Sequence, residues 1–270
     1  MAERTVRVAV SGAAGRMGRA AVRTVLREPD LRLVAALGRQ QGVGRDAGEV
    51  AGLGPAGVPI VAEPEAVWAA APDVLVEFVP GAPAAIHARA ALERGIRPVV
   101  GSTGLSAADL EALRALAAAR RTGAVVAPNF ALGAVLMMEF ARVAGRFFPH
   151  VEIIELHHDR KRDAPSGTAL KTARVIAEAR GTAPGPGVAE EEMVPGARGG
   201  VADGVRLHSV RLPGLSAHQE VLFGGPGQVL TLRHDSLSEE SFMPGLLLAI
   251  RRVGSLDGLV YGLEHLLDLR

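Results

Sequence analysis

Two histidines and a lysine stand close together in the stretch HHDRKRDAPSGTALKTA, which begins at His157. A histidine titrates near neutral pH and can therefore donate a proton, and the surrounding cations should lower its pKa. Lys161 follows His157 by four residues and can supply a fixed positive charge or a proton. These residue types at this spacing predict acid–base chemistry on an anionic substrate.

A helix start follows the basic residues. Pro-Ser-Gly-Thr precedes the helical pattern ALKTARVIAEA, so Ser166, Gly167 and Thr168 should offer backbone N–H groups and a hydroxyl at a helix N-terminus. Such a terminus suits a carboxylate or phosphate. The same residues could instead form a basic, solvated loop before a capped helix. Five basic side chains beside this helix start, in a chain with a dinucleotide-binding turn, favour a site for a small substrate carrying carboxylates.

A metal site is not expected in this stretch. His157 and His158 end the strand-like run VEIIEL, and adjacent strand residues point to opposite faces, so they cannot easily share one ion. The chain contains no cysteine, which excludes disulfides, thiolate metal sites and a cysteine nucleophile. An aspartate-semialdehyde dehydrogenase needs that nucleophile and is excluded for this reason.

A glycine turn lies near the N-terminus. Gly12, Gly15 and Gly18 stand between the strand-like run from Thr5 to Val10 and a helical pattern. Glycines at a first strand-to-helix turn let a pyrophosphate approach the backbone N–H groups of the helix. The alternative is a tight turn with close helix packing. We favour dinucleotide binding because of the position of the turn.

The second strand, LRLVAAL, bears on the choice of cofactor. A carboxylate after this strand favours NAD, whereas an arginine accepts the 2′-phosphate of NADP. Here Gly38 supplies no carboxylate and Arg39 follows, so we expect NADPH to be preferred over NADH. Arg39 could alternatively be a solvated loop charge. Two further loops, 101–104 and 127–130, end later strands and should lie against the nicotinamide.

The order of elements predicts the fold class. Strand-like runs also begin at Asp73, Arg97 and Ala124, with helical patterns over 82–94 and 106–121. Nearly continuous apolar strands that alternate with helices favour an N-terminal, Rossmann-type doubly wound parallel sheet over residues 1–130.

The rhythm changes after Phe130. We expect a second, α+β domain over residues 131–240, with a long helix (131–147), the strand VEIIEL, and later strands in VRLHSVRL, HQEVLFGG and QVLTLRH that form a mixed or antiparallel sheet. Residues 181–204 should form a mobile surface loop. Residues 241–270 should be helical and pack back on the first domain.

Composition narrows the possible partners. The formal net charge is +1 and aromatic residues make up 3%, so neither nucleic acid nor an anionic membrane is an expected partner. No long apolar segment or targeting segment follows the start. We expect a cytoplasmic protein.

Four segments together resemble one enzyme family. GAAGRMG, ELHHDRKRDAPSGTA, HSVRLPGLSAHQEVLFGG, and RHDS before SFMPG are similar to the 4-hydroxy-tetrahydrodipicolinate reductase (dihydrodipicolinate reductase) family of lysine and diaminopimelate biosynthesis. The resemblance covers essentially the whole chain. It implies a Rossmann domain, a substrate domain whose sheet builds a homotetramer, and reduction by NADPH or NADH.

The resemblance also implies roles for individual residues. By motif, His157 is the proton donor, Lys161 the second catalytic residue, and the substrate carboxylates contact His158, Ser166, Gly167 and Thr168. The implied reaction is loss of water from a hydroxylated ring, hydride transfer to the conjugated imine, and protonation by His157. The cofactor-binding positions are Gly12, Ala13, Ala14, Gly15, Arg16, Met17, Arg39, Gly101, Ser102, Thr103, Ala127, Pro128, Asn129 and Phe130.

Some positions depart from the family pattern. Gly38 replaces an acid, Glu77 and Val79 replace an aspartate and a Thr or Ser, and an arginine usual after RHDS is replaced near Glu239.

Two alternatives remain from the residues alone. The glycine turn would also suit a sugar or inositol dehydrogenase, and a non-catalytic protein that senses NADP(H) would bind cofactor without turnover.

Overall fold

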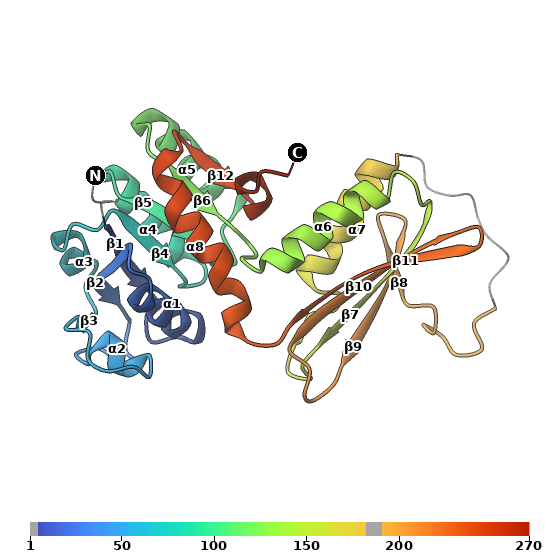
Figure 1. Cartoon of the computed structure of the whole chain (residues 1–270), viewed down its shortest axis with the longest axis horizontal. Helices are drawn as coiled ribbons and strands as arrows, with labels where there is room; N and C mark the ends of the chain where they lie inside the picture. The colour runs from blue at the N-terminus through green and yellow to red at the C-terminus, as the bar shows by residue number, and fades with distance from the viewer. Residues whose placement is uncertain (1–4, 182–190, 270) are drawn as a thin grey trace. The chain divides into compact units, whose positions relative to one another are not determined.

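The structure is a computed structural model that describes residues 5–181 and 191–269. The chain forms two compact units, whose elements are labelled in Figure 1. The first unit joins the chain up to Phe130 with the segment from Glu239 onward. The second unit spans Ala131–Ser238.

A parallel sheet of seven strands forms the centre of the first unit. Its interior strands are apolar on both faces, and Val8, Val10, Leu75 and Val76 are fully buried, as expected for a sheet covered on both sides. In sheet order the strands are β12 (Leu259–Tyr261), β6 (Ala124–Val126), β5 (Arg97–Val100), β4 (Val74–Glu77), β1 (Val6–Ser11), β2 (Leu31–Leu37) and β3 (Ile60–Val61).

The helices of this unit connect parallel strands. From β1 the chain proceeds to β2 and β3 on one side, and from β4 to β5 and β6 on the other, so the topology reverses between β1 and β4. Ligands of open α/β sheets bind at such a reversal, outside the carboxyl ends of the strands. The helices are α1 (Arg16–Arg27), α2 (Ala47–Val50), α3 (Pro64–Ala69), α4 (Ala82–Glu93), α5 (Ala107–Arg120) and α8 (Met243–Arg252).

The C-terminal segment differs from the prediction of a wholly helical tail. After α8 and the 3₁₀ turn η2 (Val253–Ser255), strand β12 pairs in parallel with β6, and Leu259 lies opposite Ala124. The last element of the described part is the 3₁₀ turn η3 (Leu263–Leu266). A strand of three residues is too short to show an alternating pattern, which is why the sequence did not reveal it.

The second unit contains a mixed sheet of five strands, as predicted. Strand β7 pairs in parallel with β9 and antiparallel with β10. In sheet order the strands are β11 (Gln228–Ser236), β10 (Ala217–Gly225), β7 (His150–His157), β9 (Val205–Arg211) and β8 (Gly200–Ala202), with helices α6 (Leu132–Ala144) and α7 (Gly167–Arg180).

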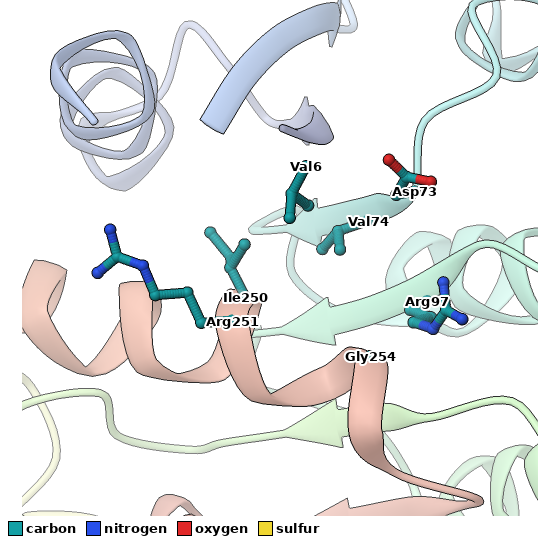
Figure 2. A pocket seen from close by; sticks show the side chains of 7 residues that line it. All are labelled: Val6, Asp73, Val74, Arg97, Ile250, Arg251 and Gly254. Atoms are coloured by element: carbon teal, nitrogen blue, oxygen red, sulfur yellow. The ribbon is translucent and has the colours of Figure 1, made fainter. Parts of the chain in front are cut away.

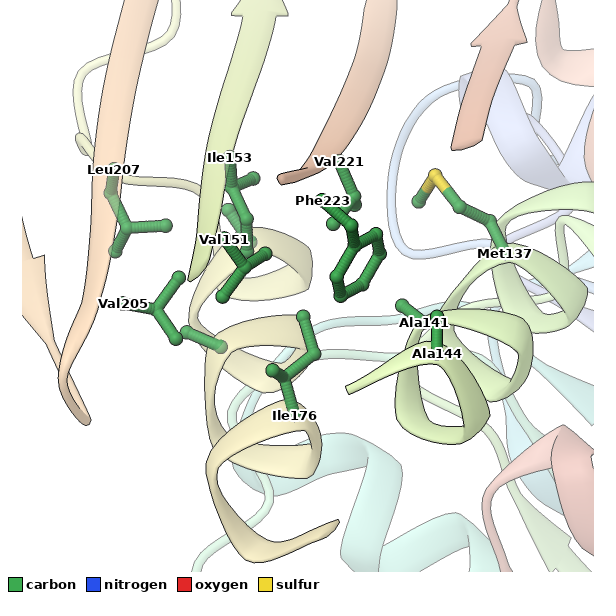
Figure 3. Packing of buried hydrophobic residues seen from close by; sticks show 12 residues of the cluster. Met137, Ala141, Ala144, Val151, Ile153, Ile176, Val205, Leu207, Val221 and Phe223 are labelled. Carbon is green, nitrogen blue, oxygen red and sulfur yellow. The ribbon is translucent and has the colours of Figure 1, made fainter. Parts of the chain in front are cut away.

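Both helices cover the same face of this sheet (Figure 3). Ile153 and Phe223 point from the strands toward Ile176 of α7 and Met137 of α6. The alternation of strand residues sends the neighbouring side chains to the other face, which no helix of the described residues covers. We call the half-buried apolar residues there the outer patch: Ile154, Leu156, Val210 and Leu222.

The segment predicted as a mobile loop over 181–204 contains a strand. Residues 182–190 lie outside the described part, and the remainder includes β8, paired antiparallel with β9. Asp203 and Gly204 both have positive φ and connect these strands, as in a type I′ hairpin turn. The Asp-Gly pair was a readable signal for this hairpin.

The predicted fold class is confirmed. A doubly wound parallel sheet is followed by an α+β unit with a mixed sheet. The C-terminal segment belongs to the same compact unit as the parallel sheet.

Candidate active site

The cofactor positions expected from the sequence gather at one edge of the parallel sheet. Residues 12–17 follow β1, Arg39 follows β2, residues 101–103 follow β5, and residues 127–130 follow β6. Because these strands are parallel, their carboxyl ends meet at the same edge, beside the reversal between β1 and β4. The structure therefore brings all of these residues to the edge where dinucleotides bind in this class of fold.

The glycine turn fits a pyrophosphate group. Gly12 has φ +77°, a conformation that favours glycine, and a β-carbon on Gly18 would overlap the carbonyl group of Gly12. Gly15 is the N-cap of α1 and provides no side-chain cap, so the first N–H groups of the helix are left for a ligand. An anion can thus approach this backbone closely.

The loop after β5 depends on a glycine. A β-carbon on Gly101 would lie 2.6 Å from Cε2 of Phe130 and would also overlap the ring of Phe78. These two rings pack edge to face, with centroids 6.3 Å apart. The Ser102 hydroxyl donates to the carbonyl of Glu77 at 3.1 Å and so ties this loop to β4.

A buried carboxylate that the sequence marked only as a departure organises the end of β4. Glu77 is fully buried, accepts from the backbone N–H of Val79 at 2.6 Å and lies 2.7 Å from Nδ1 of His87 on α4. A carboxylate only accepts hydrogen bonds, so Nδ1 of His87 carries the proton. Glu77 thereby fixes the loop that begins at Phe78.

Arg39 lies exposed in the turn after β2, and in the described part of the chain its side chain makes no hydrogen bond or ion pair. Its neighbour Gly38 is tightly packed, because a β-carbon there would lie 2.8 Å from Cγ2 of Ile60. Arg16 of the glycine turn pairs with Glu239 at 3.1 Å. Glu239, which lies near the position where the family pattern has an arginine, therefore forms an ion pair with an arginine of the glycine turn.

In the second unit, His157 contacts a glutamate that the sequence did not single out. Nδ1 of His157 lies 2.5 Å from Oε2 of Glu155, two residues earlier on the same face of β7. Because the carboxylate accepts this bond, the ring carries its proton on Nδ1 and directs Nε2 away from Glu155. The period-2 alternation of VEIIELH could have revealed this pair.

Arg211 of β9 completes the cluster around Glu155. Its Nη1 and Nη2 donate to the two carboxylate oxygens at 2.9 and 2.7 Å, and Nη2 also donates to the carbonyl of Asp163 at 2.8 Å. The backbone N–H of Ser166 donates to Oε1 of Glu155 at 3.2 Å. We call Glu155, His157 and Arg211 the inner cluster.

Burial and charge act in opposite directions on the inner cluster. Burial lowers the pKa of His157, while the hydrogen bond and charge of Glu155 raise it and the charges of Lys161 and Arg211 lower it, so the pKa lies below its usual value. Burial alone would raise the pKa of Glu155, but the hydrogen bonds from Arg211, Ser209 and His157 outweigh it. The Glu155 carboxylate is therefore ionised at neutral pH.

Lys161 and His158 both lie in the segment between β7 and α7. Nζ of Lys161 donates to Oδ2 of Asp163 at 2.6 Å, and this bond lowers the pKa of Asp163. Nδ1 of His158 is buried and has no hydrogen-bond partner among the described residues. A buried polar atom without a partner is costly, so this atom suits a ligand group.

The start of α7 is open to an anion. Ser166 is the N-cap, and its hydroxyl accepts from the N–H of Ala169 at 3.2 Å. The N–H groups of Gly167 and Thr168 have no partner inside the helix, and a β-carbon on Gly167 would meet nothing within 4 Å. Ser166, Gly167 and Thr168 thus form one helix N-terminus, which Glu155 connects to His157 through the Ser166 N–H.

One cavity in the first unit lies away from this chemistry (Figure 2). Its volume is about 160 Å³, and Val6, Val74 and Arg97 line it from the amino ends of their strands, opposite the cofactor edge. Arg251 at its rim is already paired with Glu28 and Asp30. The cavity is therefore unrelated to the glycine turn.

The described residues contain neither a metal-binding cluster nor a membrane-spanning helix. Over 5–181 and 191–269, no group of three or more histidine and acidic side chains could hold a metal ion. Among the same residues, no helix is long and apolar enough to cross a membrane.

Known proteins share both units of this chain. A family model described as dihydrodipicolinate reductase, N-terminus, matches residues 6–130, and its C-terminal counterpart matches residues 133–267. A 4-hydroxy-tetrahydrodipicolinate reductase from Moorella thermoacetica is 56% identical over 265 residues, which cover 98% of each chain.

Solved structures give the same relationship. A dipicolinate-bound dihydrodipicolinate reductase from Paenisporosarcina sp. TG-14 is 45% identical, with a TM-score of 0.87 over 97% of this chain and 100% of that one. A myo-inositol dehydrogenase from Corynebacterium glutamicum is 17% identical, with a TM-score of 0.60 over 94% of this chain and 90% of that one, and it shares the fold alone.

A Rossmann-type sheet with a glycine turn after its first strand, followed by a unit with a mixed sheet, is a fold of dinucleotide-dependent oxidoreductases. The chain belongs to the dihydrodipicolinate reductase family. Members of this family are NAD(P)H-dependent enzymes of lysine and diaminopimelate biosynthesis. The sugar or inositol dehydrogenase alternative is therefore wrong.

Proposed function

We propose that this protein reduces 4-hydroxy-tetrahydrodipicolinate to tetrahydrodipicolinate with NAD(P)H. The observation that carries the proposal is the position of His157 beside an uncapped pair of N–H groups at the start of α7. Its Nδ1 is engaged by Glu155, so Nε2 is the ring atom that can exchange a proton with a substrate. The family relationship supplies the substrate class.

His157 is the proton donor. A general acid acts best when its pKa lies near the working pH; burial lowers the pKa of His157, and the hydrogen bond and charge of Glu155 oppose that lowering. Lys161 supplies a second positive charge to the anionic transition state. Its bond to Asp163 is exposed to solvent on the carboxylate side, so a substrate group can compete for the ammonium.

The substrate carboxylates bind at the start of α7. The N–H groups of Gly167 and Thr168 and the Ser166 cap offer hydrogen bonds there, and the buried, unpartnered Nδ1 of His158 is a further group for the substrate. Backbone donors at a helix N-terminus stabilise negative charge without reorganising during the reaction. The relative with dipicolinate bound supports a dicarboxylate of this size.

The cofactor is held by the turn of residues 12–17 and the loops 101–103 and 127–130. When bound, the reduced nicotinamide supplies the hydride. Arg39 would pair with the 2′-phosphate of NADPH, and we propose that NADPH is preferred because Gly38 offers no carboxylate. Arg39→Ala should lower kcat/KM for NADPH about 10-fold or more and leave kcat/KM for NADH within about twofold. Equal losses with both cofactors would contradict this preference.

The test of the whole proposal is coupled turnover. The substrate is generated in situ from pyruvate and aspartate semialdehyde with its synthase, and oxidation of NADPH and NADH is followed separately. Wild type should turn over, and His157→Gln should lose about 10²- to 10⁴-fold in kcat because a positioned general acid contributes that much. Cofactor binding without turnover would overturn the proposal in favour of an NADP(H) sensor.

We propose further that four copies assemble through the uncovered sheet of the second unit. The outer patch is a set of apolar side chains at the centre of that face, and charged pairs such as Glu220 with Arg233 surround it. An apolar centre with a polar rim is typical of subunit interfaces. Light scattering should give four times the 28.0 kDa chain mass, and Leu222→Glu should give smaller species. A monomeric wild type would refute the assembly.

A further inference from the structure

We propose that Glu155, held by Arg211, is a positioning residue that fixes the proton donor and the substrate-binding helix start relative to one another. This inference rests on the proposed role of His157. Glu155 touches neither substrate nor cofactor in the proposal, and it acts through His157 and Ser166.

The hydrogen bonds of Glu155 carry the inference. Oε2 accepts from His157 Nδ1 and Arg211 Nη1, and Oε1 accepts from Arg211 Nη2 and the Ser166 N–H. An ionised carboxylate has about four acceptor sites, and these four bonds fill them; the Ser209 side chain adds a further hydrogen bond to the same carboxylate. One carboxylate therefore connects the ring on β7 with the N-cap of α7, and either can move away only by breaking its own bond to Glu155.

Burial makes these bonds strong. The Glu155 side chain is fully buried, and its charge is balanced by a bidentate arginine, the geometry that best satisfies a carboxylate. Arg211 is itself anchored to the carbonyls of Val210 and Asp163. A carboxylate fixed in this way holds the imidazole in one tautomer and one orientation, with Nε2 presented to the substrate.

The charged groups that face His157 come from three segments. Glu155 lies on its own strand, Arg211 on the neighbouring β9, and Lys161 and Asp163 on the following loop, where His158 also lies. Among the charges with the largest effects on His157, that of Glu155 raises its pKa, while those of Lys161 and Arg211 lower it. Loss of the Glu155 charge should therefore weaken the proton affinity of the ring.

The experiment compares Glu155→Gln with wild type in the coupled assay from pH 6 to pH 9. Gln keeps the size and one acceptor but removes the charge. We expect kcat to fall about 10- to 100-fold, the range for residues that orient an active group, with KM for the substrate changed less than about threefold. Since the donor must be protonated, the limb on which kcat falls with rising pH should move to lower pH.

A second variant protects the test against misfolding. Glu155→Gln leaves Arg211 without its partner, so Glu155→Gln/Arg211→Met removes both charges together, which proteins often tolerate. The double variant should fold and still show the lowered kcat and the limb displaced to lower pH, because Glu155 affects His157 more than Arg211 does. Wild-type kcat and an unmoved limb in this variant would overturn the proposal.

A matched control comes from the same strand. Glu152 also accepts hydrogen bonds from a histidine and an arginine, but on the opposite face of the sheet. Glu152→Gln should keep kcat and the pH limb within about twofold and about 0.2 pH units of wild type. If His157→Gln retains activity, the proton-donor assignment itself fails. If His157→Gln is inactive while Glu155→Gln behaves as wild type, the positioning role alone fails.

Discussion

Strand β7 carries two clusters of the same composition, one on each face of its sheet. The inner cluster consists of Glu155, His157 and Arg211. The outer cluster consists of Glu152, His208 and Arg198, with His208 Nε2 at 2.7 Å and Arg198 Nη2 at 2.6 Å from the carboxylate. Distances alone do not distinguish them, because both contain short, charge-assisted bonds.

The two clusters differ in their exposure to solvent. Relative exposures of the side chains are 0%, 15% and 19% for Glu155, His157 and Arg211, against 35%, 25% and 40% for their outer counterparts. Water weakens a charge pair and replaces a lost partner, whereas a buried charge that loses its partner stays uncompensated. The two glutamates therefore differ in burial and in what else they hold, since of the two only Glu155 also accepts from a helix N-cap.

The largest difference should appear when each arginine is replaced by methionine. Arg211→Met leaves the buried Glu155 charge unpaired and should lower the free energy of unfolding by about 3–5 kcal/mol. Arg198→Met removes a pair that is partly exposed within one chain and should cost at most about 1 kcal/mol. Thermal and urea unfolding of the two variants in the Leu222→Glu background, where partner copies do not cover the outer face, would measure both values. Equal losses would show that burial does not separate the clusters.

Parts of this site formed by residues close together in the sequence could be predicted, and parts formed by residues far apart in the sequence could not. The glycine turn and the stretch from His157 to Thr168 are local, and both were predicted from residue types and spacing. Arg211 is 56 residues from Glu155, and only the pairing of β7 with β9 brings them together. No local pattern reports such a register.

Two other features were missed for different reasons. The pairing of Glu77 with His87 depends on how α4 packs beside β4, which sequence spacing does not give. Strand β12 has three residues, so its pairing with β6 comes from tertiary packing and not from its own pattern. In contrast, the turn at Asp203 and Gly204 is local, and the Asp-Gly pair in the sequence is a signal for it.

A smaller difference between wild type and His157→Gln should appear in how the free energy of unfolding changes as pH falls. Because burial lowers the pKa of His157 in the folded protein, the unfolded chain takes up the proton first as pH falls below about 6.5. The stability present above that pH is therefore lost as pH falls through the folded pKa. His157→Gln should flatten this dependence, although His234, whose pKa burial also lowers, keeps part of it. Unfolding free energies measured from pH 8 to pH 5 would test the difference, and parallel curves would contradict it.

The smallest effect is the influence of salt on the destabilisation that each arginine replacement causes. At about 1 M salt the screening length falls to about 3 Å, which is comparable to the ion-pair distances of the outer cluster. The destabilisation caused by Arg198→Met should therefore shrink to a few tenths of a kcal/mol in 1 M NaCl. The destabilisation caused by Arg211→Met should persist, because water and ions do not reach the Glu155 carboxylate. Urea unfolding of both variants at 0.05 and 1 M NaCl gives the four values. A salt-sensitive Arg211→Met would mean that solvent reaches Glu155, and the carboxylate could then no longer hold His157 as rigidly as its four hydrogen bonds require.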